Sequence, residues 1–343
     1  MDYLIFRTDR IGDFLITSPL INAIKRNDSK SKIYVVASSK NKNFIKDCNL
    51  VDEIFVLKSK KTKDKLKLLF ELRKNKFDNI IIADKKNRSI LLSIFLNSKN
   101  KIFNVSKKLQ GKILKIFYEN VFIDNDNLKH QSAKDILKHN CSSLNFDLKK
   151  EDFHYLKPDQ FKNKFLHSDT FDLDKLDFLL FHCDEKWEIQ NYAKSFEKAI
   201  EYTDININFK DFIIFLSDLS KKTSKKIILT TGTIETDIIN ELKRSSKQIN
   251  EFVYEISLNE SKGYLLINSN FFSVSHMISK SSLFISCHGA FTHIASNYNI
   301  KILDVIEKNK TIHYTKITSH MNNYKILHRD NFLKLSKDII NNS

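Results

Sequence analysis

Two arginines, a glycine and an aspartate stand together near the start of the chain: Arg7, Arg10, Gly12 and Asp13. They follow an apolar run at residues 3–6 and precede an apolar periodic segment, which predicts a strand, a turn and a helix. Asp13 would begin that helix as a cap or first-turn acid, and Gly12 would give the turn a positive φ or a close backbone approach. A carboxylate at this position can also take a proton from a hydroxyl group. A simple capped turn explains the same residues equally well.

Two more glycines stand where a predicted strand gives way to a predicted helix. Gly232 follows the strand at 226–230, and Gly289 follows the strand at 282–286. The chain has only five glycines. Three of them, Gly12 included, lie where a predicted strand meets a predicted helix, which indicates a shared role. Ligands of open parallel sheets bind beside the carboxyl ends of the strands, and helix N-termini there bind phosphate. The sequence therefore predicts a site for a phosphorylated ligand at these crossings.

Apolar runs alternate with helical patterns along the whole chain. Strands are predicted at residues 3–6, 32–37, 51–57, 79–83 and 101–103, and again at 178–181, 226–230, 282–286 and 301–306. Helices are predicted at 64–74, 88–96, 190–202 and 235–243. The almost wholly apolar strands indicate an α/β fold with parallel sheets that are covered on both faces. The strand at 301–306 is expected to close the second sheet.

The alternating pattern stops and restarts near the middle of the chain. Residues 152–174 carry Pro158, many charges and no long apolar periodicity. We place the connection between two domains there, because a chain of 343 residues is long enough for two. The predicted domains are residues 1–165 and 170–343.

The formal charge of +16 comes from lysines that are spread over the whole chain. Most of them are interpreted as solvated surface, and no recognition-helix, RNP or zinc-finger pattern accompanies them, so nucleic acid is not expected as a partner. The four cysteines are widely spaced, without a CxxC motif or a secretory signal, which is typical of a reduced cytoplasmic protein. No apolar run reaches the roughly 18 residues of a membrane-spanning helix.

Two further segments have patterns with more than one interpretation. Residues 106–118 place Leu109, Ile113, Ile116 and Phe117 on one helical face and lysines elsewhere. Such a helix can lie on an anionic membrane or be an ordinary surface helix, and we favour the ordinary surface helix. DxD sequences at 124–126 and 172–174 have the form of metal-binding motifs, but neither has a second ligand cluster beside it. No metal ion is therefore expected.

The motif near the start of the chain carries a family resemblance. Arg10-Ile11-Gly12-Asp13, followed by an apolar helix with Thr17 and Pro19, resembles the N-terminus of the family 9 glycosyltransferases, which include the bacterial lipopolysaccharide heptosyltransferases. The resemblance implies a GT-B fold, in which two Rossmann-like domains face an interdomain cleft. It also implies that Asp13 is the catalytic base, with Arg10 and Gly12 on the acceptor side.

Segments of the second half resemble the same family. Lys186, after a buried strand and a polar loop, resembles the lysine that meets the nucleotide diphosphate. Thr231, Gly232 and Glu235 resemble a turn whose glutamate approaches the ribose, although Glu235 is also explained as an ordinary acid near a helix N-terminus.

The closing signature of the family, usually Asp-Thr-Gly-x-x-His, is matched with one departure. Counting back from His293 places the aspartate of the signature on His288, its threonine on Gly289 and its glycine on Ala290. The resemblance implies that this aspartate helps to hold the donor sugar or its phosphates. Because an alternative alignment on Gly289 also restores no carboxylate, heptose is not assumed as the sugar.

The resemblance implies an inverting, metal-independent glycosyltransferase that uses no cofactor. Its donor would be a nucleotide sugar, ADP-linked as one option, and its acceptor an anionic glycolipid or another cell-surface glycan. The expected location is the cytoplasm, with peripheral contact at the cytoplasmic face of the inner membrane left open. The alternatives are a nucleotide-sugar epimerase or inactive binder of the same fold and, third, a basic nucleic-acid-binding protein.

Overall fold

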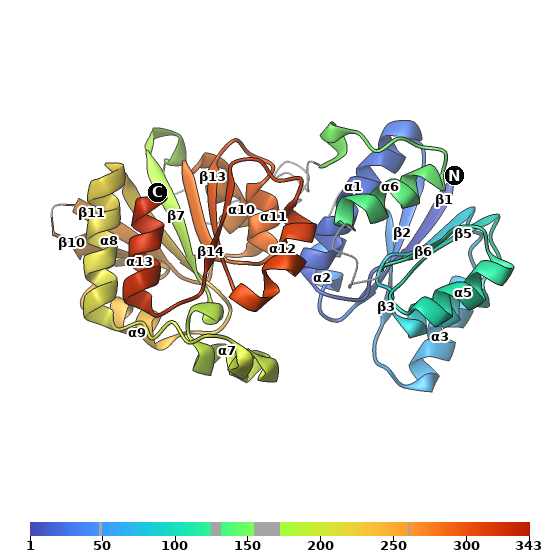
Figure 1. Cartoon of the computed structure of the whole chain (residues 1–343), viewed down its shortest axis with the longest axis horizontal. Coiled ribbons are helices and arrows are strands. Elements are labelled where there is room, and N and C mark those ends of the chain that lie inside the picture. Colours follow the sequence, from blue (N-terminus) through green and yellow to red (C-terminus); the bar gives the residue numbers. More distant parts are fainter. Residues whose placement is uncertain (48–49, 125–131, 154–171, 260) are drawn as a thin grey trace. The chain divides into compact units, whose positions relative to one another are not determined.

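The computed structural model describes the chain except for residues 48–49, 125–131, 154–171 and 260 (Figure 1). The chain divides into two compact units. Unit 1 comprises Met1–Asn163 with Thr315–His320, and unit 2 comprises Lys164–Tyr314 with Met321–Ser343. The boundary predicted near residues 165–170 lies outside the described residues.

Unit 1 is built on a six-stranded, fully parallel sheet. Its strands are β1 (Asp2–Phe6), β2 (Lys32–Ser38), β3 (Glu53–Leu57), β4 (Asn79–Ile82), β5 (Asn100–Val105) and β6 (Val121–Ile123). They lie in the order β3-β2-β1-β4-β5-β6. The helices are α1 (Ile11–Asn27), α2 (Lys42–Lys46), α3 (Thr62–Leu72), α4 (Asn87–Ile94), α5 (Lys108–Phe117) and α6 (Ala133–Ser142), followed by the short η1 (Lys150–Phe153).

The helices of unit 1 cover both faces of the sheet. Leucines and isoleucines of α3, α4 and α5 pack in one core cluster with side chains of β1, β2, β4 and β5, while α1 and α6 lie side by side on the other face (Figure 1). This double cover explains why β1 and β4 are apolar at nearly every position, because both faces of each strand are buried.

Unit 2 is built on an eight-stranded mixed sheet. Its strands are β7 (Phe178–Cys183), β8 (Lys226–Thr231), β9 (Lys247–Asn250), β10 (Val253–Leu258), β11 (Ser261–Leu266), β12 (Leu283–Cys287), β13 (Lys301–Ile306) and β14 (Tyr324–His328). They lie in the order β14-β13-β12-β7-β8-β11-β10-β9. Every pairing is parallel except those of β10, which runs antiparallel to β9 and β11.

Helices again cover the sheet of unit 2. They are α7 (Ile189–Ser195), α8 (Phe209–Thr223), α9 (Asp237–Ser245), α10 (Phe271–Lys280), α11 (Ala290–Ala295) and α13 (Phe332–Asn341), with short turns η3 (Leu173–Lys175), η4 (Glu185–Trp187), η5 (Glu197–Glu201) and η6 (Lys308–Lys310). The remaining helix, α12 (Thr311–Thr318), is divided between the units, because its residues from Thr315 belong to unit 1. Trp187 is fully buried, and its ring lies 4.7 Å from that of Phe181 in the core cluster under α8, α9 and α13.

The predicted α/β class is confirmed, with two sheets in which parallel pairing dominates. Several details are corrected. The strand predicted at 301–306 is β13, but β14 lies outside it, and β11, β10 and β9 extend the opposite edge. The helix predicted at 190–202 is α7 followed by η5. Edge strands such as β14 are partly exposed and carry polar residues, so they lack the apolar run that marks a buried strand.

Gly12 is also placed differently from the prediction. It lies inside α1 rather than in the turn before it, and no glycine in the described part of the chain has a positive φ. The turn is instead made by the residues that precede Ile11.

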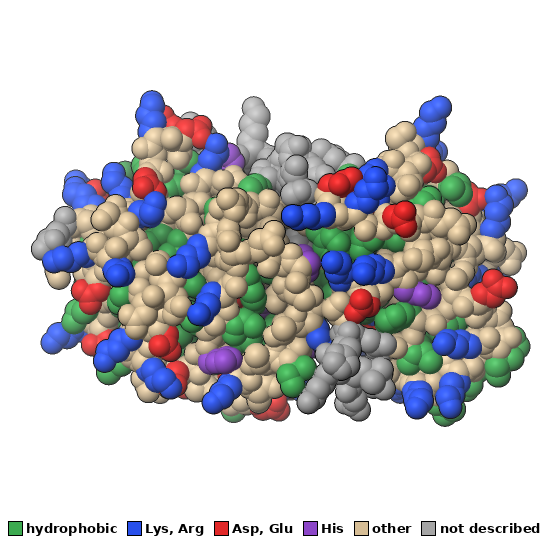
Figure 2. Space-filling view, turned by 45° about the horizontal axis from the view of Figure 1, so that its top comes forward, with side chains coloured by type: hydrophobic (Ala, Val, Ile, Leu, Met, Phe, Trp, Pro, Cys, Tyr) green, Lys and Arg blue, Asp and Glu red, His purple; other side chains and the backbone are tan. Residues whose placement is uncertain are grey.

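Lys and Arg side chains are spread over the visible face of both units (Figure 2). This dispersal agrees with the interpretation of most lysines as solvated surface.

Candidate functional site

In each sheet, successive strands are added first on one side of the first strand and then on its other side, and the place where the side changes is the switch point. In unit 1, β1 lies between β2 and β4; in unit 2, β7 lies between β8 and β12. Ligands of open α/β sheets bind at such switch points, beside the carboxyl ends of the strands. We define the first switch point as residues 7–13 and 83–89, and the second as residues 184–188 and 288–293.

Arg7 organises the first switch point. Its side chain is buried, its Nε donates to the backbone oxygen of Asp13 at 2.8 Å, and its Nη1 donates to the backbone oxygen of Ala83 at 2.7 Å. The guanidinium therefore joins the end of β1, the start of α1 and the end of β4. Its role is to position the loop that carries the predicted base.

Asp13 is the third residue of α1 and accepts a hydrogen bond from the backbone N–H of Arg10 at 3.1 Å. This is the first-turn role that the sequence predicts. The other carboxylate oxygen, Oδ1, accepts no hydrogen bond from the residues that the structure describes. Asp13 is partly exposed and Arg10 is exposed, so both side chains can reach a ligand at this edge of the sheet.

Asp9 is a second carboxylate at the same place, and sequence reasoning missed it. Only 18% of its side chain is exposed, and its Oδ1 lies 3.7 Å from Nη1 of Arg7. Burial raises the pKa of Asp9 to about 6, against the opposing effect of Arg7 and with a smaller contribution from Asp13. A carboxyl group that titrates near neutral pH is typical of a functional site. Its spacing from Asp13 was visible in the sequence, but its burial was not.

A buried aspartate after β4 supports the opposite side of this switch point. Asp84 accepts hydrogen bonds from the hydroxyl of Thr8 at 2.5 Å, the hydroxyl of Ser89 at 2.7 Å and the backbone N–H of Lys86 at 3.1 Å. Arg88 donates to the same Thr8 hydroxyl at 2.7 Å. These bonds hold the loop after β4 against the loop after β1 and place two cations, Lys86 and Arg88, beside the carboxylates.

Lys186 organises the second switch point. Its ammonium lies 2.7 Å from Oδ2 of Asp184 and donates to the backbone oxygens of His288 at 2.9 Å and Cys287 at 3.3 Å. Burial lowers the pKa of Lys186, but Asp184 outweighs it, so the net pKa lies above the ordinary lysine value. An ammonium has three N–H donors, and here all three have acceptors. Lys186 therefore joins the end of β7 to the end of β12.

A buried arginine that sequence reasoning also missed braces this lysine. Arg329, just after β14, donates to the backbone oxygen of Lys186 at 2.7 Å and to that of Thr203 at 3.0 Å. Its distance along the chain from Lys186 left no local signal of the contact.

The two predicted glycines of unit 2 allow close approaches. A Cβ on Gly289 would lie 2.9 Å from the ammonium of Lys186, and a Cβ on Gly232 would overlap the carboxylate of Glu185 and lie 3.0 Å from Cβ of Asp184. Both glycines therefore lie against the loop after β7. Thr231, at the end of β8, pairs in register with Cys183 of β7. The structure thus brings Thr231, Gly232, Gly289 and Lys186 together.

His288 is held by a carboxylate from the neighbouring strand. Its Nδ1 lies 2.6 Å from Oδ2 of Asp304 on β13, and Asp304 also accepts from the hydroxyls of Tyr324 at 2.6 Å and Thr292 at 3.1 Å. Because an ionised carboxylate only accepts, Nδ1 carries the proton and Nε2 presents a lone pair in the neutral ring. The family signature has an aspartate at the position of His288. In this chain a carboxylate is present at that place too, but it belongs to Asp304 and lies behind the histidine.

The remaining predicted residues have distinct surroundings. Ala290 is the first residue of α11, and the buried ring of His293 lies edge-on to that of His288 at 5.3 Å between centroids. Glu235 lies before α9 with its side chain largely exposed, and it pairs with Lys243 at 3.0 Å. The first turn of α9 is instead met by Glu188, which accepts from the backbone N–H of Ile238 at 3.3 Å.

The DxD sequences are engaged with lysines. Asp124 pairs with Lys85, while residues 125–126 lie outside the described residues. Asp172 and Asp174 pair with Lys175 and Lys280. Among the residues that the structure describes, no group of three or more His, Cys, Asp or Glu side chains has the arrangement of a metal site. In the same part of the chain, no helix combines the length and the apolar character that crossing a membrane requires.

Comparisons with known proteins place the fold. No family model and no curated protein matches the chain. Among solved structures, E. coli heptosyltransferase WaaC with ADP-2-deoxy-2-fluoro heptose is similar at TM-score 0.62 and 12% identity, with 100% of both chains covered. A family 9 glycosyl transferase from Veillonella parvula is similar at TM-score 0.62 and 11% identity, covering 98% of this chain and 88% of the other.

A third solved structure represents another activity. A protein from Listeria monocytogenes described as a UDP-N-acetylglucosamine 2-epimerase is similar at TM-score 0.57 and 10% identity, covering 99% of this chain and 87% of that one. The architecture is therefore the GT-B fold, as the resemblance of the motifs implies. Within that class, the chain has the fold of the family 9 glycosyltransferases and heptosyltransferases.

Proposed function

We propose that the chain is an inverting glycosyltransferase that moves a sugar, heptose or a related one, from a nucleotide diphosphate donor to a lipopolysaccharide-core or other cell-surface glycan acceptor. The observation that carries the proposal is the second switch point, where a partly buried cation, Lys186, lies against the Gly289 turn in a GT-B fold. The expected location is the cytoplasm, and no nucleic acid is proposed as a partner.

Asp13 is proposed as the general base. An acceptor hydroxyl oxygen attacks the anomeric carbon and loses its proton to the carboxylate, while the bond from that carbon to the diphosphate oxygen breaks and its electron pair leaves with the diphosphate. Direct attack from the opposite side inverts the anomeric centre. The oxygen of Asp13 that is not used by the helix cap is the one available to receive the proton.

Lys186 and the Gly289 turn are proposed to stabilise the leaving diphosphate in place of a metal ion. Since each N–H of the ammonium already has an acceptor, a phosphate oxygen would replace one backbone carbonyl. Thr231, Gly232, Glu235, Ala290 and His293 complete the proposed donor side. The heptosyltransferase neighbour holds an ADP-linked heptose analogue, so an ADP-sugar is the first donor to test, with no further cofactor.

Arg10 is proposed to bind an anionic group of the acceptor, because a guanidinium binds phosphate or carboxylate in a bidentate manner. Gly12, in the first turn of α1, is proposed to lie beside it on the acceptor side.

A thermal-shift panel of nucleoside diphosphates and nucleotide sugars tests the donor side, since a ligand that binds the folded state raises its stability. Release of the nucleoside diphosphate is then measured with and without acceptor-containing membrane extract. A transferase releases it only when acceptor is present. Failure of every nucleotide to stabilise the protein would refute the proposal.

The second candidate is a nucleotide-sugar epimerase or an inactive nucleotide-sugar binder, which the similarity to the Listeria structure favours. An epimerase would change the sugar of the added donor, or release the nucleoside diphosphate, without any acceptor. A binder would be stabilised by the nucleotide sugar and change nothing.

A further inference from the structure

The apolar face of α5 points away from the core. Leu109, Ile113, Ile116 and Phe117 expose between 50% and 75% of their surface, and the helix buries Gly111 and Leu114 instead. The expected ordinary surface helix would bury this apolar face, so that interpretation is wrong for α5.

A glycine explains why the helix is turned this way. A Cβ on Gly111 would overlap the side chain of Ile123 and approach Cγ2 of Val105 to 3.0 Å. The backbone of α5 therefore lies directly on β5 and β6, with its smallest residue toward the sheet and its large apolar residues toward the surroundings. Close packing of α5 on the sheet therefore determines which side of the helix faces outward.

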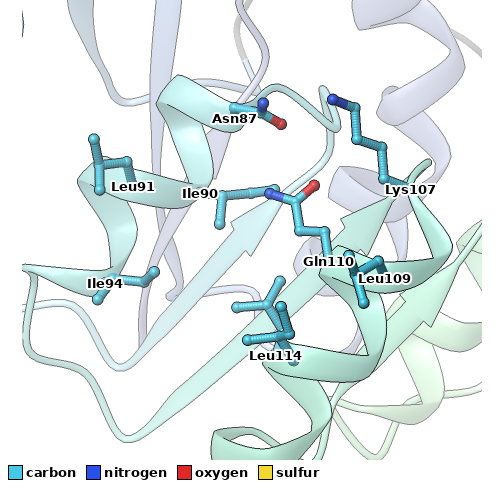
Figure 3. Close-up of a pocket in the computed structure, with 9 residues that line it drawn as sticks. Asn87, Ile90, Leu91, Ile94, Lys107, Leu109, Gln110 and Leu114 are labelled. Atoms are coloured by element: carbon cyan, nitrogen blue, oxygen red, sulfur yellow. The ribbon is translucent and has the colours of Figure 1, made fainter.

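The neighbouring helix continues the apolar surface. Leu91, Ile94 and Phe95 at α4 expose between 39% and 52% of their surface. Between α4 and α5 lies a groove of about 450 Å³. Its lining is mainly aliphatic, with Asn87 and Lys107 at one end (Figure 3). Contiguous apolar patches of this kind mark surfaces that bind a partner. We call these residues of α4 and α5, with the groove, the α4–α5 face.

The segment that carries this face contains charges of one sign, and two of its lysines pair with aspartates outside it, Lys85 with Asp124 and Lys99 with Asp78. Residues 85–118 contain nine Lys or Arg and no Asp or Glu, whereas the whole chain has 57 basic and 41 acidic residues. The nine are Lys85, Lys86, Arg88, Lys99, Lys101, Lys107, Lys108, Lys112 and Lys115. The partner that complements large apolar side chains among an excess of cations is an anionic lipid surface.

We propose that the α4–α5 face docks on an anionic bilayer, with Ile116 and Phe117 among the acyl chains and the lysines of α5 at the headgroups. A protein partner would complement the apolar residues, but nothing in such a partner requires this long stretch without a carboxylate. Docking of this face does not depend on the proposed transferase activity. If the proposed function holds, docking places headgroups at the end of the groove where α4 and α5 begin, the same sheet edge as Asp13.

Vesicle flotation of the full chain tests the proposal with neutral phosphatidylcholine vesicles and vesicles that contain about 30% phosphatidylglycerol. We expect flotation with the anionic vesicles only, and its loss at high salt. The paired substitutions Ile116→Glu and Phe117→Glu are expected to weaken binding at least tenfold. The matched control is Ile200→Glu with Ile312→Glu, at positions of unit 2 that are 74% and 60% exposed, which is expected to leave binding unchanged.

Circular dichroism and thermal stabilisation by nucleotides are measured on both variants. These measurements separate loss of folding, or loss of the proposed donor site, from loss of docking. Equal binding to neutral and anionic vesicles, or equal loss in both variants, overturns the proposal. So does a concentration-dependent dimer that Ile116→Glu with Phe117→Glu abolishes, because a second copy would then be the partner of this face.

Discussion

The two switch points occupy the same topological position but have opposite chemistry. The first is organised around carboxylates, Asp9, Asp13 and Asp84, which are held by hydroxyls, backbone N–H groups and Arg7. The second is organised around an ammonium, Lys186, which is held by carbonyl oxygens and Asp184. The first arrangement suits the removal of a proton, and the second suits an anion. Substitutions at the first should therefore change turnover, and those at the second should change nucleotide binding.

The largest effect is expected at the proposed base. Asp13→Asn keeps the shape of the side chain but removes its ability to take a proton, so turnover should fall on the order of 10²–10⁴-fold. Nucleotide affinity, measured by calorimetry, should stay unchanged. Full transferase turnover in this variant would end the assignment of the base.

The next effect concerns the cation of the second switch point. Lys186→Met leaves the Asp184 carboxylate and two carbonyl oxygens without their donor, so stability should fall by about 2–4 kcal/mol. Affinity for the nucleoside diphosphate should fall about tenfold or more. Lys222→Met, on the exposed side of α8, is the control. Unchanged diphosphate affinity in Lys186→Met would restrict this lysine to its structural contacts.

A smaller and more selective effect is expected from Asp304→Asn. The new amide donates to Nδ1 of His288, which moves the ring proton to Nε2 and converts that nitrogen from an acceptor to a donor. Affinity for the nucleotide sugar should fall about tenfold, while affinity for the nucleoside diphosphate alone stays the same. Nitrogen chemical shifts of His288 report the tautomer directly. Equal losses for both ligands would mean that Asp304 acts only through local packing.

The last effect is on stability rather than on ligand binding, and at Asp9 it depends on pH. Its folded-state pKa of about 6 lies above the ordinary value of 3.8, so the folded state holds the proton more tightly and stability falls as pH rises from about 4 through 6. Asp9→Asn should remove this dependence and gain about 2–3 kcal/mol at pH 7, with only a small gain at pH 4. Urea unfolding at both pH values measures it. Parallel pH curves for the variant and the wild-type chain would show that Asp9 is solvated.

The central strands and the residues at their carboxyl ends were predictable because both are encoded locally. An uninterrupted apolar run marks a strand that is buried on both faces, and the polar residues after it must lie at the sheet edge, as Asp13, Lys186 and Gly289 do. The outer strands β9, β10 and β14 were not predicted. Their half-exposed positions mix polar and apolar residues, which no local period separates from a loop.

What the sequence by itself determined is therefore the class of fold and the identity of the groups at each strand end. Only the tertiary structure decided which of those groups meet. Asp304 lies behind His288 because β13 pairs in register with β12. Arg329, after β14, reaches Lys186, after β7, across the two strands between them. Gly111 turns the apolar side of α5 outward, although the helical pattern alone indicates burial. In each case the partner is distant along the chain, and contacts between distant residues depend on strand register and close packing rather than on local pattern.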